Sequence, residues 1–166
     1  IAHCTSKPAT HSLQYCGEGA WPAKVLLALS IDLGRTLMKP IRSFLFVPGS
    51  RASWLDKVPA YGADAIILDL EDSVPLASKD EARKIVASRI AMLVAAGQRV
   101  FVRINKSAFL YSMKDLEAVV VPGVEGIVLS KPNGPEDVDM AALMVSEAET
   151  LNGLAVGSLV LVPTLE

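Results

Sequence analysis

The chain has 166 residues, 51% hydrophobic content and a formal net charge of −2, which suits one folded domain and excludes a disordered polymer. Lysine and arginine are spread along it and no apolar run approaches the roughly 18 residues of a transmembrane helix, so neither nucleic acid nor a membrane is expected as a partner. Both cysteines and both histidines lie within the first sixteen residues. The remainder therefore cannot use a Cys/His dyad, a Ser-His-Asp triad or a His/Cys zinc site.

Residues 1–37 differ from the rest of the chain, because they show no clear periodicity and Met38 stands directly before the first well-patterned segment. We expect Met38 to be the native start. Residues 1–37 would then be an extension: a targeting segment, a processed piece or sequence translated from upstream of the true start. They fit a secretory signal poorly, and we expect a cytoplasmic protein.

From Ile41 onward, short apolar runs alternate with longer amphipathic segments. The apolar runs predict strands at 44–47, 65–70, 99–104, 126–129 and 159–162. The amphipathic segments predict helices at 52–61, from 78 to the stop at 97, at 112–120 and at 135–151. Ser78 and Glu81 form an S-x-x-E capping box for the second helix, and Pro135 opens the last one.

Repeated strand-then-helix units predict an α/β fold with parallel strands and right-handed crossovers. The turn after the first strand, residues 48–51 (PGSR), is neither a G-x-G-x-x-G turn nor a P-loop, which disfavours a doubly wound nucleotide-binding sheet. We therefore predict a (β/α)8 TIM barrel. Such a barrel needs about 250 residues, so we expect residues 38–166 to be a partial barrel domain with roughly the first five strands.

Charged and polar side chains gather where the predicted strands end, and in a barrel these ends form one rim. In chain order they are Arg51; Asp69, Glu71 and Asp72; Arg103 and Asn105; Lys131; and Glu166. Carboxylates and waters hold a divalent cation, while arginine binds the carboxylate of an oxo acid. This set predicts lyase or aldolase chemistry in which a metal stabilises an enolate when a C–C bond breaks.

Six segments, in this order and spacing, resemble the HpcH/HpaI aldolase and citrate lyase β-subunit family, and most closely its citrate lyase β-subunit-like branch, which includes malyl-CoA and citramalyl-CoA lyases. They are FLFVPGSR (44–51), GADAIILDLEDSVP (62–75), KDEARK (79–84), VRIN (102–105), GIVLSKP (126–132) and VPTLE (162–166). The resemblance covers essentially all of residues 38–166 and none of residues 1–37.

The resemblance implies a Mg²⁺-dependent barrel that cleaves or forms a C–C bond between a 2-oxo acid and an acyl thioester of CoA or of an acyl carrier. Arg103 would bind the oxo-acid carboxylate, and Glu166 would be a direct Mg²⁺ ligand. Glu71 and Asp72 would support metal-bound waters as part of the catalytic set. The substrate and its thioester would lie near three further residues: Arg51, Asn105 and Lys131.

The chain departs from the family pattern in two places. Ser130 stands where the family often has Pro, and we expect this change to be harmless. The second acidic metal ligand is expected from a sixth strand, beyond Glu166, and this leaves other interpretations open. A non-catalytic, truncated or degenerate subunit that binds an acyl carrier or a partner is one alternative. A CoA-independent pyruvate aldolase is another, although that branch commonly uses a His not seen here. We expect a homo-oligomer in either case.

Overall fold

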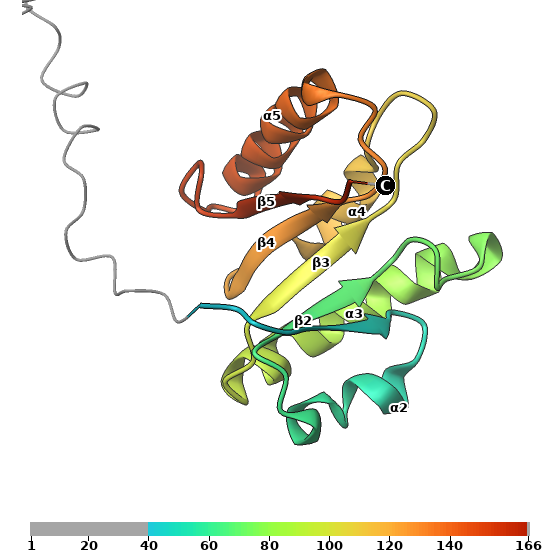
Figure 1. Ribbon diagram of the computed structural model, residues 1–166, viewed down its shortest axis with the longest axis vertical. Coiled ribbons are helices and arrows are strands. Elements are labelled where there is room, and N and C mark those ends of the chain that lie inside the picture. The colour runs from blue at the N-terminus through green and yellow to red at the C-terminus, as the bar shows by residue number, and fades with distance from the viewer. Residues whose placement is uncertain (1–39, 166) are drawn as a thin grey trace, which may run out of the picture. The chain divides into compact units, whose positions relative to one another are not determined.

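The computed structural model of the protein describes residues 40–165 (Figure 1). It contains one five-stranded sheet in which each strand is parallel to its neighbours and the spatial order follows the chain. The strands are β1 (Phe44–Pro48), β2 (Ala65–Asp69), β3 (Val100–Ile104), β4 (Val124–Leu129) and β5 (Val160–Pro163). A doubly wound sheet reverses its strand order at a switch point. The unreversed order is that of successive barrel strands.

The helices connect consecutive strands, and Figure 1 shows α3 and α4 behind the strands. In chain order they are α2 (Ala52–Leu55), the 3₁₀ turns η1 (Val58–Tyr61) and η2 (Leu76–Ser78), α3 (Lys79–Ala95), α4 (Met113–Val119) and α5 (Pro135–Leu151). Of the helices within residues 40–165, none has both the length and the apolar character needed to cross a bilayer.

Two local predictions were wrong. The helix expected at 52–61 is two short pieces, α2 and η1, because Pro59 lies in the first turn of η1 and cannot donate a backbone hydrogen bond to a preceding turn. The capping box was also wrong: Ser78 precedes α3 but makes no side-chain cap hydrogen bond. Ser78 ends the 3₁₀ turn η2, and its ψ of 1° is not the extended conformation that a capping serine adopts.

The two faces of the sheet are buried to different extents. The face toward the helices carries the main core, in which Leu68, Val102 and Leu129 pack with side chains of α3, α4 and α5. The opposite face has a smaller cluster of Ala65, Ile67, Phe101 and Val128. Because side chains alternate along a strand, the polar residues that follow Ile67 and Phe101 by two positions project from this second face.

The fold therefore brings the carboxyl ends of all five strands to one edge of the sheet. The extension predicted for residues 1–37 and the predicted metal ligand Glu166 both lie outside the described residues.

Candidate active site

The acidic end of β2 meets Arg103 of β3 because the two strands are parallel and Asp69 is paired with Arg103 in the register. Arg103 Nε donates to Asp69 Oδ1 at 2.7 Å, and Nη2 donates to Oδ2 at 2.8 Å. Only 2% of the Asp69 side chain and 14% of the Arg103 side chain are exposed. Two parallel charge-assisted hydrogen bonds hold the guanidinium in one orientation.

The Asp69 carboxylate also fixes the loop that follows β2. Its Oδ1 accepts a hydrogen bond from the backbone N–H of Glu71 at 2.9 Å, and Oδ2 accepts one from that of Ser73 at 3.1 Å. Burial opposes the ionisation of Asp69, but the hydrogen bonds from Arg103, Ser73 and Glu71 outweigh it and lower the pKa of Asp69 to about 2. The hydrogen bonds to Asp69 in turn raise the pKa of Arg103. Both side chains are therefore charged at neutral pH.

Glu71 and Asp72 lie in the same loop and face cations from two other strand ends. Lys131, which follows β4, donates to Glu71 Oε1 at 3.0 Å and to Asp72 Oδ1 at 2.9 Å. Arg103 Nη1 lies 3.4 Å from Glu71 Oε2 and 3.7 Å from Asp72 Oδ2. The hydrogen bond from Lys131 lowers the pKa of Asp72, and the bonds to Asp72 and Glu71 raise that of Lys131.

We call Asp69, Glu71, Asp72, Arg103 and Lys131 the rim cluster. Its three carboxylates and two cations leave one net negative charge. Glu71 Oε2 is buried and accepts no hydrogen bond, so its negative charge is offset there by the ion pair with Arg103 Nη1 at 3.4 Å. The rim cluster therefore has capacity for an additional cation or hydrogen-bond donor.

The rim cluster borders an open pocket of about 600 Å³. The pocket is lined by Phe46, Pro48, Trp54, Asp69, Asp72, Ser73 and Arg103. The guanidinium carbon of Arg103 lies 5.0 Å from the centre of the Phe46 ring, which is within the range of cation–π attraction. One wall of the pocket is thus aromatic, and the other carries charged side chains of both signs.

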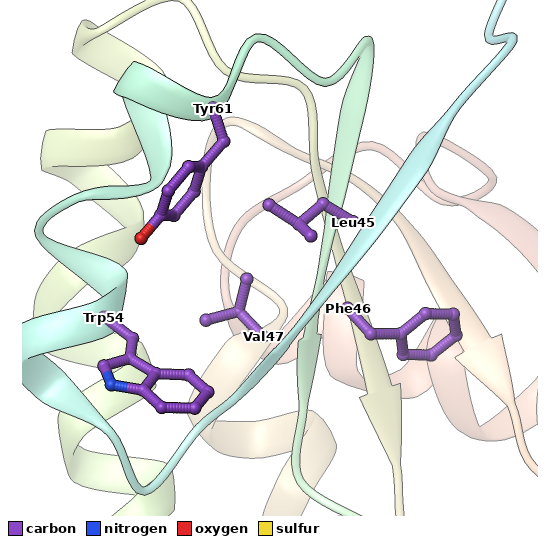
Figure 2. A pocket seen from close by; sticks show the side chains of 5 residues that line it. All are labelled: Leu45, Phe46, Val47, Trp54 and Tyr61. Carbon is purple, nitrogen blue, oxygen red and sulfur yellow. The ribbon is translucent and has the colours of Figure 1, made fainter.

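A smaller apolar pocket of about 250 Å³ lies against β1 (Figure 2). Leu45 and Val47 point from β1 toward Trp54 and Tyr61, whereas Phe46 points to the other side of the strand. The alternation along β1 therefore sends Phe46 toward Arg103, and Trp54 borders both pockets.

Comparison with known proteins matches residues 42–166 to the HpcH/HpaI aldolase/citrate lyase family. This chain belongs to that family. Citrate lyase subunit beta of Haemophilus influenzae is 35% identical over 129 residues, which cover 78% of this chain and 44% of that protein. A (3S)-malyl-CoA thioesterase of Cereibacter sphaeroides is 32% identical over 108 residues, or 65% of this chain and 38% of that protein.

Among solved structures, the magnesium/glyoxylate complex of Haloferax volcanii malate synthase matches with a TM-score of 0.61 at 19% identity, over 74% of this chain and 42% of that chain. This likeness confirms the predicted barrel fold class. The chain spans less than half the length of each of these three relatives.

Two further residues of the family motifs lie outside the rim cluster. Arg51 is exposed just before α2, with its guanidinium carbon 6.0 Å from the centre of the Trp54 ring, and it does not line the larger pocket. The Asn105 amide donates to the Leu70 carbonyl at 2.9 Å and to Asp115 Oδ2 at 2.7 Å. Asp115 belongs to α4 and is fully buried, so the structure turns Asn105 toward the helix layer.

A second group of side chains, which was not predicted from the sequence, binds the backbone carbonyls of the loops that carry the rim cluster. Lys79, at the start of α3, donates to the carbonyls of Leu70 at 2.7 Å and Glu71 at 2.5 Å. Lys106 donates to the carbonyl of Lys131 at 2.9 Å. Lys79 stands in the family segment KDEARK, which was the one available signal, but neither its partners nor those of Lys106 follow from local spacing.

Proposed function

We propose that this chain carries part of the active site of a Mg²⁺-dependent carbon–carbon lyase that acts on a hydroxyacyl thioester of the citryl-, malyl- or citramalyl-CoA type. In this reaction the bond between the carbinol carbon and the thioester α-carbon breaks. The hydroxyl proton leaves, the carbinol carbon becomes the keto carbon of a 2-oxo acid, and the electron pair passes to the thioester fragment, which is protonated to an acyl thioester. Family membership supports this reaction class.

One observation supports the proposal most directly: Arg103 is held by a buried acid and still faces the open pocket. A guanidinium has five N–H donors, and Asp69 takes two of them. The other donors, including those on Nη1 beside Glu71, would bind the carboxylate of a 2-oxo acid. Asp69 would act as the positioning residue that keeps this edge of Arg103 turned toward the substrate.

The acids of the rim cluster fit the neighbourhood of a hard cation. No group of three or more Asp, Glu, His or Cys residues within 40–165 is arranged to hold a metal ion by itself. We therefore place Glu71 and Asp72 around the waters of Mg²⁺, with the buried, unbonded Oε2 of Glu71 as one acceptor, and propose Glu166 as a direct ligand. When bound, Mg²⁺ would supply Lewis-acid polarisation of the substrate oxygen.

The deciding assay measures release of a 2-oxo acid from hydroxyacyl-CoA thioesters by the complete protein, with Mg²⁺ and with EDTA. Arg103→Ala should lower kcat/KM at least about 100-fold, because two charge-assisted hydrogen bonds are worth about 1.5–3 kcal/mol each. The matched control is Arg99→Ala, since Arg99 pairs with Glu125 at the opposite end of β3. Full activity of Arg103→Ala, or activity unaffected by EDTA, would contradict the assignment.

The likeness to a (3S)-malyl-CoA thioesterase favours a second candidate, hydrolysis of the same thioester. Water would then break the C–S bond and release a free hydroxy acid and a thiol, whereas the lyase reaction leaves the thioester intact. Measuring free thiol and 2-oxo acid in the same reaction separates the two activities. Binding of the thioester without either product would instead favour a non-catalytic subunit.

A further inference from the structure

Lys131, which follows β4, has a left-handed backbone conformation. Its φ is +47°, and among residues 40–165 it is the one residue other than glycine with a positive φ. The left-handed region is unfavourable for a residue with a Cβ, so the surrounding structure must hold it there. From this conformation the Lys131 ammonium reaches across β3 to Glu71 and Asp72 in the loop after β2.

Three side chains from other elements bind the backbone on both sides of Lys131. Tyr111 OH donates to the carbonyl of Ser130 at 3.1 Å, and Lys106 Nζ donates to the carbonyl of Lys131 at 2.9 Å. Asp137, in the first turn of α5, accepts from the backbone N–H of Asn133 at 2.7 Å. The turn from β4 into α5 is therefore fixed at Ser130, Lys131 and Asn133.

The central support is a shielded ion pair. Lys106 Nζ lies 2.5 Å from Asp137 Oδ2, and only 8% of the Lys106 side chain and 21% of the Asp137 side chain are exposed. The Lys106 ammonium is also 5.7 Å from the centre of the buried Tyr111 ring. Desolvating such a pair is costly, and the further hydrogen bonds that Lys106 donates to the Lys131 carbonyl and that Asp137 accepts from Asn133 help to offset this cost.

We propose that Lys106, paired with Asp137, is a positioning residue that holds the left-handed turn at Lys131 and thereby keeps the Lys131 ammonium on Glu71 and Asp72. The hydrogen bond from Lys106 Nζ fixes the orientation of the Lys131 carbonyl. This orientation in turn determines where the Lys131 Cα–Cβ bond points. The importance of the two acids rests on the proposed function, but the positioning itself can be measured without substrate.

The test is acylation of lysines in the folded protein, followed by mass spectrometry, with EDTA present so that bound metal plays no part. A lysine held between two carboxylates reacts slowly, and releasing it raises its rate. Lys106→Met should raise the acylation rate of Lys131 about 5-fold, the factor for an interaction of about 1 kcal/mol. Lys84, exposed on α3, should be unaffected and serves as the internal reference.

Lys106→Met leaves Asp137 without its cation and could weaken the fold, so the double variant Lys106→Met/Asp137→Asn removes both charges and keeps an acceptor for Asn133. It should also speed the acylation of Lys131, toward the rate in Glu71→Gln/Asp72→Asn. An unchanged Lys131 rate in both variants, or an equal rise at Lys84, would overturn the proposal. Neither outcome depends on whether lyase activity is found.

Discussion

Replacing Asp69 by Asn tests whether the buried pair with Arg103 stabilises the fold as its geometry indicates. The pKa of Asp69 falls from an ordinary 3.8 to about 2. At about 1.4 kcal/mol per pKa unit, this difference corresponds to about 2 kcal/mol of stability at pH 7. Asp69→Asn should therefore lower the free energy of unfolding by about that amount, because the amide cannot replace both charge-assisted hydrogen bonds.

The stabilisation that Asp69 contributes should decrease as the pH falls. The folded-state pKa lies below the unfolded-state pKa, so the stabilisation is complete above pH 4 to 5 and is lost as the pH falls toward 2. The two pKa values leave about half of this stabilisation at pH 3 and little of it at pH 2. The difference between wild type and Asp69→Asn should shrink accordingly.

Urea unfolding of both proteins between pH 7 and pH 3 measures this difference. Asp64→Asn is the matched control, because Asp64 pairs at the surface with Arg42, whose side chain is 81% exposed, and exposed pairs contribute little. A penalty for Asp69→Asn that is the same at pH 7 and pH 3 would show that the charge of Asp69 is not the source of the stability.

Three further substitutions test the support of the rim. Gly49→Ala should cost about 1–3 kcal/mol in urea unfolding, because its Cβ would lie 2.8 Å from the Asp69 carbonyl oxygen and from Val86 Cγ2; a neutral result would contradict this. Glu149→Gln should cost about 2 kcal/mol, since the fully buried carboxylate accepts three hydrogen bonds, whereas exposed Glu147→Gln on the same helix should change little. Lys131→Gly should melt roughly 2–4 °C higher than Lys131→Ala, the reverse of the usual order, because only glycine relaxes the positive φ.

The positions of the strands and the long helices follow from local sequence. Apolar runs and glycine or proline punctuation place each strand within two residues, and the helix predicted at 135–151 is α5 as observed. The errors at 52–61 and at Ser78 arise where two local signals compete. Amphipathic spacing favoured a continuous helix at 52–61, but Pro59 restarts it as a 3₁₀ turn. At Ser78 the capping motif competed with the preceding 3₁₀ turn, and the turn determined the backbone.

The sequence predicts which residues gather in the rim cluster, but it does not predict which side chains contact one another. Barrel topology brings strand ends together, which is why Arg103 and Lys131 meet the acids after β2. The alternation that placed Asn105 with Arg103 fails because β3 ends at Ile104, one residue earlier, and the buried Asp115 then binds the amide. Lys106 and Asp137 are 31 residues apart, and no periodicity in the sequence relates them.

The loop after β2 is held from both sides, and this explains how three acids can stay close together. Their carboxylates face Arg103 and Lys131, while the carbonyls of Leu70 and Glu71 face Lys79 and Asn105 on the helix side. Because Lys79 and Asn105 already fix the backbone of the loop, Arg103 and Lys131 do not have to order it as well. Their attraction to the carboxylates can then offset the mutual repulsion of the acids, while the rim cluster keeps one net negative charge beside the pocket.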